Sequence, residues 1–213
     1  MSAAEAEKRA AAEKAAALVE DGMILGLGTG STVAYLLPAL AARELSLRCI
    51  STSPQTEAQA RALGLAVEPF DTVDRLDLAI DGADQVDPAG WVVKGGGAAH
   101  TREKVVASAS DRFVVIVSSD KLVEAIAPPI PLELLPFGLP ATLRALGDAE
   151  LRGVPRSPDG GVIADYLGSV EDAGELAERL SAVPGVVEHG LFPPGLVSEV
   201  LVGRDGRVDR LVP

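Results

Sequence analysis

The first 120 residues alternate short apolar runs with stretches dense in helix-forming residues. The apolar runs predict buried strands at 23–28, 45–50, 77–81, 91–94 and 112–119, and a possible strand at 65–70. The intervening stretches predict helices at 3–20, about 31–43, 56–64 and 101–108, of which the second is capped by Ser31 and Thr32 and kinked at Pro38. Strands that are apolar throughout and separated by helices are typical of a mostly parallel sheet covered on both faces.

The pattern changes after Lys121. The following apolar runs and amphipathic stretches predict the order β-α-β-β-α-β, with strands at 132–135, 150–154, 161–166 and 185–190 and helices at 139–147 and 171–183. This order is typical of a ferredoxin-like α+β unit. The last stretch predicts a hairpin around Asp205 and Gly206, and we expect this hairpin to lie at the edge of the first domain. We therefore predict an α/β domain of residues 1–128 plus about 196–213, and a smaller domain of about 129–195.

The balance of charges restricts the partners of this chain. Its 19 Lys and Arg face 31 Asp and Glu, a formal charge of -12, so it lacks the basic surface that nucleic acid requires. The first twenty residues carry Glu, Lys and Arg, unlike a signal peptide, and no uncharged apolar run reaches membrane-spanning length. We expect a cytoplasmic protein with no nucleic-acid or membrane partner.

Cysteine and histidine are too few and too scattered for a metal site built by the protein. The one cysteine, Cys49, lies in an apolar run and is expected to be a buried, small hydrophobic residue. His100 and His189 lie far apart, and neither has the partner of a ligand pair. We expect no metal.

Polar residues gather where the predicted strands end. In an open parallel sheet, ligands bind beyond the carboxyl ends of the strands, because loops and helix N-termini converge there. The segments that follow the strands are Gly28–Thr32, Ser51–Ser53, Asp81–Asp84, Lys94–Gly97 and Ser118–Lys121. We expect all of them to lie at one edge of the sheet.

The segment Gly28–Thr32 has the composition of a phosphate site at a helix N-terminus, although a tight strand-to-helix turn with a Ser/Thr cap is the favoured explanation for this segment taken alone. Its glycine spacing differs from that of a dinucleotide site, no acidic residue ends the second strand, and no Lys follows the glycines. A nicotinamide cofactor and a nucleotide P-loop are therefore disfavoured. The acidic segment that begins at Asp81 also fails to match a calcium-binding loop.

Together with Lys94 and Glu103, the acidic residues near Asp81 would supply an acid, a base and a cation to one small site. Glu103 can take a proton from a carbon next to a carbonyl, Lys94 can stabilise the resulting oxyanion, and Asp81 can move a proton between oxygens. Glu103 has to be partly desolvated for this task, because a glutamate with an unperturbed pKa of about 4.3 is a weak base.

The motifs GLGTGST, DGAD, KGGGAAHTREK and PGVVEHGLF together resemble those of the type A ribose-5-phosphate isomerase family, in the same order and spacing. The resemblance runs through essentially the whole chain. It implies a Rossmann-like α/β domain with a smaller α+β domain that takes part in oligomerisation. It also implies interconversion of ribose 5-phosphate and ribulose 5-phosphate through a cis-enediolate, in the non-oxidative pentose phosphate pathway. The family uses neither a metal nor an organic cofactor and forms homodimers or homotetramers.

The resemblance assigns roles to individual residues. Glu103 is the implied base, Asp81 the acid and ring-opening residue, and Lys94 the oxyanion-stabilising cation, while Asp84 lies in the same pocket. The implied substrate contacts are Thr29, Gly30, Ser31, Thr32, Gly82, Ala83, Gly95, Gly96, Gly97, Lys121 and Lys8.

Three positions depart from the family pattern. His100 replaces a usually apolar residue, Gln85 replaces a glutamate, and Val162 stands where Asn or His is common. Two other functions remain open: a non-catalytic sugar-phosphate sensor, which needs neither Glu103 nor Lys94, and an acyl-CoA transferase with a glutamate nucleophile.

Overall fold

The computed structural model describes residues 2–213, which cluster into two units. Unit 1 contains the chain up to Ala83 together with Arg102–Leu122 and Gly195–Pro213, and unit 2 contains Asp84–Thr101 and Val123–Pro194. The predicted smaller domain of about 129–195 has narrower bounds than unit 2, which also contains Asp84–Thr101 and begins its second segment at Val123.

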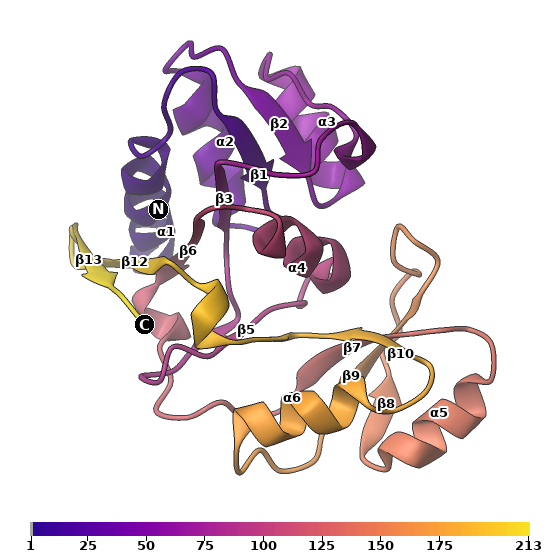
Figure 1. Cartoon of the computed structure of the whole chain (residues 1–213). Coiled ribbons are helices and arrows are strands. Elements are labelled where there is room, and N and C mark those ends of the chain that lie inside the picture. Colours follow the sequence, from indigo (N-terminus) through magenta and orange to yellow (C-terminus); the bar gives the residue numbers. More distant parts are fainter. Residues whose placement is uncertain (1) are drawn as a thin grey trace. The chain divides into compact units, whose positions relative to one another are not determined.

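Unit 1 is built on a six-stranded sheet in the order β13-β12-β6-β3-β1-β2. Every neighbouring pair is parallel except β12 and β13, which form the predicted hairpin at the edge (Figure 1). The strands are β1 (Ile24–Leu27), β2 (Arg48–Ser51), β3 (Leu78–Asp81), β6 (Phe113–Ser118), β12 (Glu199–Arg204) and β13 (Arg207–Leu211). The prediction of a mostly parallel sheet, with the last hairpin returned to its edge, is confirmed.

The helices of unit 1 are α1 (Ala3–Ala16), α2 (Val33–Ala41), α3 (Pro54–Ala62) and most of α4 (His100–Ser108). Alanines of α1 and leucines of α2 pack with β1, β3 and β6 in one continuous apolar core. Cys49 of β2 belongs to this core with no exposed surface, and burial raises the pKa of its thiol to about 11. The expectation of a buried cysteine is confirmed.

Three local predictions in unit 1 are wrong. The first helix ends at Ala16 instead of residue 20, where the Arg43 guanidinium donates to the carbonyls of Ala16 and Val19 and so satisfies the helix end. Thr32 precedes α2 in a helical conformation and makes no capping hydrogen bond with its side chain. The possible strand at 65–70 reduces to a single bridge between Val67 and Cys49, followed by the short helix η1 (Phe70–Thr72).

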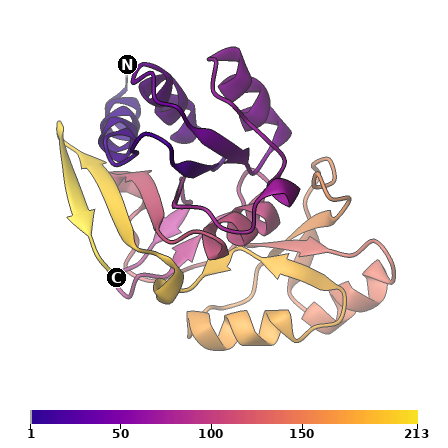
Figure 2. The ribbon, with the colours of Figure 1, turned by 45° about the horizontal axis from the view of Figure 1, so that its top comes forward.

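Unit 2 contains a four-stranded antiparallel sheet in the order β10-β7-β9-β8. Its elements are β7 (Ile130–Leu134), α5 (Leu139–Leu146), β8 (Ala149–Leu151), β9 (Val162–Tyr166), α6 (Ala173–Ser181) and β10 (Val186–His189). Figure 2 shows α5 and α6 on the same face of this sheet, where Leu146, Leu176 and Leu180 join its apolar core. The predicted β-α-β-β-α-β unit is confirmed.

A second, three-stranded antiparallel sheet in unit 2 corrects the predicted position of residues 91–94. Here β5 (Val92–Val93) pairs with β4 (Gln85–Val86) and with β11 (Leu191–Phe192), so it is not a strand of the parallel sheet. The connection from β4 to β5 is a tight turn in which Gly90 donates to the Asp87 carbonyl over 3.1 Å. Such a turn joins antiparallel strands, whereas parallel strands need a long crossover. No helix among residues 2–213 is long and apolar enough to cross a membrane.

Candidate active site

The parallel strands of unit 1 bring several predicted site residues to one edge. β1, β2 and β3 end at Leu27, Ser51 and Asp81, which lie in neighbouring register positions. The residues that follow these strands and β6 therefore meet at the carboxyl edge, as predicted. The predicted residues at this edge are Thr29, Gly30, Ser31, Thr32, Asp81, Gly82, Ala83 and Lys121.

Asp81 is held firmly at this edge by the backbone around it. Its side chain is 3% exposed, and its Oδ1 accepts hydrogen bonds from the amides of Thr29 at 3.0 Å and Gly82 at 2.7 Å. A Cβ atom on Gly28 would lie only 1.9 Å from the Asp81 Cγ. The glycine at 28 therefore makes room for a carboxyl group, a reason different from the close approach to an anion that its motif suggested.

Glu103 reaches the same edge from the first turn of α4. The end of α4 lies at the start of β3, because the Ala109 carbonyl accepts from the Leu76 amide at 2.9 Å. The helix thus runs opposite to β3 and begins at the carboxyl edge. Val106 packs against β1, where a Cβ on Gly26 would lie 2.5 Å from its Cγ1. Glu103 lies one turn earlier on the same helix face and is only 5% exposed.

The two predicted lysines of unit 1 belong to elements that are joined by Glu7 of α1. Glu7 Oε2 accepts from the Ser119 amide at 2.9 Å and from its hydroxyl at 2.8 Å, and these bonds lower the pKa of Glu7. Lys8 follows Glu7 and donates to the Ser31 hydroxyl at 2.9 Å, while Lys121 ends the short helix η2 (Ser119–Lys121). Cations and a Ser/Thr-rich loop at this edge are suited to an anionic group.

Hydroxyl groups of three threonines stiffen the loop after β1, and of these the sequence did not point to Thr56. Thr29 Oγ1 lies 2.9 Å from Thr52 Oγ1 and 3.4 Å from Thr56 Oγ1, and the latter two side chains are buried. Two residues that follow β2 thus brace the loop that contacts Asp81.

The remaining predicted residues lie in unit 2, on and after the hairpin of β4 and β5. Gln85 pairs with Val93, so Asp84 and Lys94 are opposite each other, and the Asp84 amide donates to the Val93 carbonyl at 2.8 Å. Lys94 is 3% exposed, and its ammonium group lies 5.7 Å from the centroid of the Phe192 ring. An antiparallel hairpin, and not the edge of the parallel sheet, brings these two charged residues together.

The three glycines after Lys94 form a tight turn. The Ala98 amide donates to the Gly95 carbonyl at 3.0 Å, and the Gly96 amide donates to Asp84 Oδ2 at 2.8 Å. Gly95 has a φ of +110°, and a Cβ there would lie 2.7 Å from both His100 Nδ1 and Pro131 Cβ. Gly95 is therefore required both by its backbone conformation and by the close packing around it. His100, a departure from the family pattern, is fully buried beside it.

Gln85, another departure, has a structural role in unit 2. Its amide nitrogen donates to the Ala127 carbonyl at 2.7 Å, and its amide oxygen accepts from the Ala127 amide at 2.9 Å. A glutamate can make only the second of these bonds, so the glutamine suits this contact better. Val162, the third departure, begins β9 and pairs with Leu134. Nothing in the structure explains why valine replaces Asn or His there.

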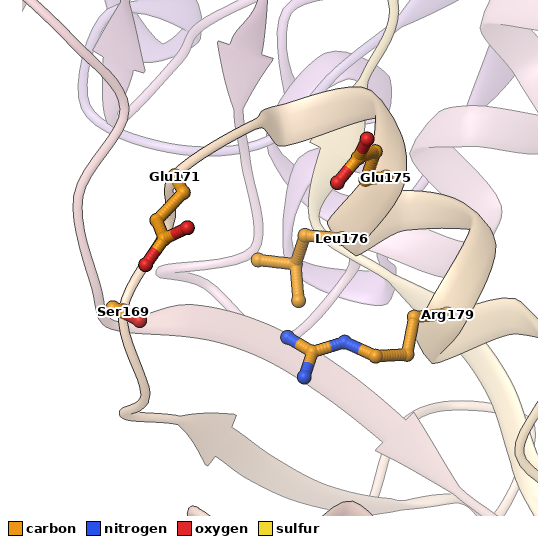
Figure 3. Close-up of a pocket in the computed structure, with 5 residues that line it drawn as sticks. All are labelled: Ser169, Glu171, Glu175, Leu176 and Arg179. Atoms are coloured by element: carbon orange, nitrogen blue, oxygen red, sulfur yellow. The ribbon is translucent and has the colours of Figure 1, made fainter.

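A separate pocket of about 420 Å³ in unit 2 contains none of the predicted residues (Figure 3). It is lined by Ser169, Glu171, Glu175, Leu176 and Arg179. The Arg179 guanidinium donates to the Tyr166 hydroxyl at 2.9 Å and lies over its ring, which makes it part of the packing of α6 on β9. Among residues 2–213, no three His, Cys, Asp or Glu side chains are grouped as a metal would require.

Comparisons with known proteins agree with the motifs. The chain matches the family model described as ribose 5-phosphate isomerase A (phosphoriboisomerase A) over residues 48–207. Ribose-5-phosphate isomerase A of Rhodopseudomonas palustris (strain HaA2) is 44% identical, over 93% of this chain and 94% of that protein. The solved ribose 5-phosphate isomerase A of Methanocaldococcus jannaschii is 35% identical with a TM-score of 0.91, covering 97% of this chain and 98% of its own. A D-ribose-5-phosphate isomerase in complex with phospho-erythronic acid is 34% identical, with a TM-score of 0.93 and full coverage of both chains. The chain therefore belongs to the ribose 5-phosphate isomerase A family and is an isomerase.

Proposed function

We propose that this protein interconverts D-ribose 5-phosphate and D-ribulose 5-phosphate, as a step of the non-oxidative pentose phosphate pathway. The observation that carries the proposal is a pair of buried carboxyl groups, Asp81 and Glu103, at the carboxyl edge of the parallel sheet in a member of this family. A related isomerase of the same fold has been solved with phospho-erythronic acid, a phosphorylated sugar acid, which supports a sugar phosphate as the substrate.

In the proposed reaction, Glu103 removes the proton from C2 of the open-chain aldose. The electrons of the C2–H bond form a double bond between C1 and C2, and the carbonyl electrons move to O1, which gives a cis-enediolate. Glu103 then returns the proton to C1, while the proton on O2 moves to O1 and leaves the ketone at C2. Burial of Glu103 at 5% exposure supports its role as base, because a carboxylate in water is a weak one.

Asp81 and Lys94 complete the proposed chemistry. Two backbone amides hold one oxygen of Asp81, which supports a role in ring opening and in the proton transfer between O1 and O2. Lys94 is buried and supplies the positive charge that stabilises the enediolate oxygens. Asp84 orients the glycine turn through the Gly96 amide.

The proposed phosphate contacts come from cations and from the loop after β1. Lys8 and Lys121 supply the charge, and residues Thr29 through Thr32 supply hydroxyl and amide groups. The backbones around Gly82–Ala83 and Gly95–Gly97 lie beside the sugar in this proposal. Every step is a proton transfer, so the proposed mechanism requires neither a metal nor an organic cofactor. The family resemblance further leads us to propose a cytoplasmic homodimer or homotetramer in which unit 2 contributes to assembly.

Incubation of the purified protein with ribose 5-phosphate tests the proposal directly. We expect the ketose to appear, as followed by NMR, and we expect the same rate after treatment with a chelator. Loss of activity that added metal restores would contradict the metal-free mechanism. Binding of ribose 5-phosphate without conversion would instead favour the sugar-phosphate sensor.

A further inference from the structure

Arg152 lies just after β8 and forms a paired contact with Asp165 of β9. Its Nε donates to Asp165 Oδ2 at 2.9 Å, and its Nη2 donates to the other carboxylate oxygen. Both side chains are 19% exposed. A guanidinium bound at two points by a carboxylate has a fixed orientation, so the remaining nitrogen of Arg152 is aimed by Asp165.

That remaining nitrogen reaches the glycine turn after Lys94. Arg152 Nη1 donates to the Gly95 carbonyl at 2.8 Å and approaches the Gly96 carbonyl at 3.3 Å. The peptide group between Gly95 and Gly96 is therefore held at both ends. Its oxygen accepts from Arg152, and its N–H donates to Asp84 Oδ2 at 2.8 Å. A cation and an anion thus fix the plane of a single peptide group.

Glycines flank this peptide group, and besides Arg152 and Asp84 it is held by the Ala98 amide, which donates to the Gly95 carbonyl at 3.0 Å. Glycine populates positive and negative φ about equally, so a peptide between two glycines rotates at little cost unless hydrogen bonds hold it. Rotation of this group would break the bond from Gly96 to Asp84 and would change the direction of the backbone that leaves Lys94. Arg152 opposes that rotation.

The far end of the same segment is anchored independently. Glu133 of β7 is 2% exposed and accepts hydrogen bonds from the hydroxyls of Thr101, at the start of α4, and Ser157. Loss of the Arg152 guanidinium would leave this anchor intact. The expected consequence is a loosened glycine turn within a folded unit.

We infer that Arg152, aimed by Asp165, is a positioning residue for the turn Lys94–Gly97 and hence for turnover. The effect of Arg152 on turnover rests on the proposed function, because the turn carries the proposed oxyanion-stabilising Lys94 and backbone contacts to the sugar. The effect of Arg152 on the conformation of the turn is independent of the proposed function.

The variant Arg152→Met tests the inference, with Arg156→Met as its matched control. Arg156 lies in the same loop, is exposed, and donates to the Gly160 carbonyl at 3.4 Å. We expect Arg152→Met to lower kcat roughly tenfold to a hundredfold with KM changed less than about threefold, because a displaced catalytic group costs rate more than binding. We also expect faster amide hydrogen exchange in the peptide that covers residues 95–98, measured without substrate. The control should change neither.

The two readouts separate the inference from the proposed function. Unchanged exchange at residues 95–98 in Arg152→Met, or turnover within twofold of the parent, would overturn the positioning role. A parent protein without isomerase activity would refute the proposed function, while the exchange measurement would still decide whether Arg152 holds the turn. If Arg152→Met does not fold, Asp165→Asn serves in its place and should give the same two changes at smaller size, since it only loosens the aim of the guanidinium.

Discussion

The two units hold their polar residues by different means. In unit 1, Asp81 and Glu103 both lie at the carboxyl edge of a parallel sheet, where strand order and helix direction place them. In unit 2, Lys94 and its glycine turn follow a strand of only two residues, and side chains from a different sheet hold them. The position of a group at a parallel edge follows from topology, whereas the position of a short turn depends on individual long-range contacts.

The largest expected effect concerns the base of unit 1. Glu103→Gln keeps the shape of the side chain but cannot accept the proton, so turnover should fall about 100-fold to 10,000-fold. Affinity for ribose 5-phosphate should stay within about threefold, since no substrate-binding charge is lost. Steady-state kinetics and calorimetry measure the two quantities. Near-normal turnover in Glu103→Gln, or an equal loss in the exposed control Glu124→Gln, would refute the role of Glu103.

The single cysteine and the single tryptophan provide separate probes of the two units, since Cys49 lies in unit 1 and Trp91 in unit 2. Because its pKa is raised to about 11, Cys49 should carry little thiolate at pH 8. Its reaction with Ellman's reagent should then be about a hundredfold slower than that of the urea-unfolded chain. Rapid labelling of the native protein would contradict the burial of β2. Labelling and Trp91 fluorescence, followed through a urea titration, would show whether the units unfold together.

Gly28 tests the packing at the parallel edge. Gly28→Ala places a Cβ where the Asp81 carboxyl group lies, so Asp81 has to turn away and lose its bond from the Thr29 amide. We expect turnover to fall roughly tenfold or more, because the carboxyl group leaves its position. The control is Gly195→Ala, where an added Cβ meets nothing within 4 Å. Equal kinetics for the two variants would show that Asp81 does not need this space.

The smallest expected effect concerns the contact of Glu7 with Ser119. The pKa of Glu7 is lowered by its hydrogen bonds with Ser119, so the stabilisation that it provides is present above the unfolded pKa, about 4.3, and is lost as the pH falls through the folded value. Glu7→Gln should therefore lower Tm by a few degrees at pH 7, and the difference from the parent should shrink below about pH 4. Differential scanning calorimetry across pH measures it, with Glu13→Gln on the same helix as the control. A Tm difference that does not depend on pH would mean that the carboxylate charge is not what stabilises this contact.

Prediction from sequence succeeded for elements with a long pattern and failed for short strands and individual long-range contacts. Helices and strands of unit 1 and the antiparallel sheet of unit 2 were predicted because each has a continuous apolar or amphipathic pattern. The pairing of β5 was predicted wrongly, because a strand of two residues has no periodicity that distinguishes a parallel neighbour from a hairpin. The motifs pointed to Asp81, Lys94 and Glu103, but the space provided by Gly28 and the contact of Arg152 were missed. Such contacts join residues far apart in the chain, and no local pattern encodes them.

The position of β12 has a consequence for how the chain is made. This strand lies between β6 and β13, yet it is synthesised only after all of unit 2. On the ribosome, both segments of unit 2 emerge while one side of β6, a fully buried strand of the finished sheet, still has unpaired backbone groups. An apolar strand with an open side is prone to pair with other chains. The nascent protein is therefore open to misassembly in the interval before β12 emerges, and slower translation of the segment up to β12 would lengthen this interval.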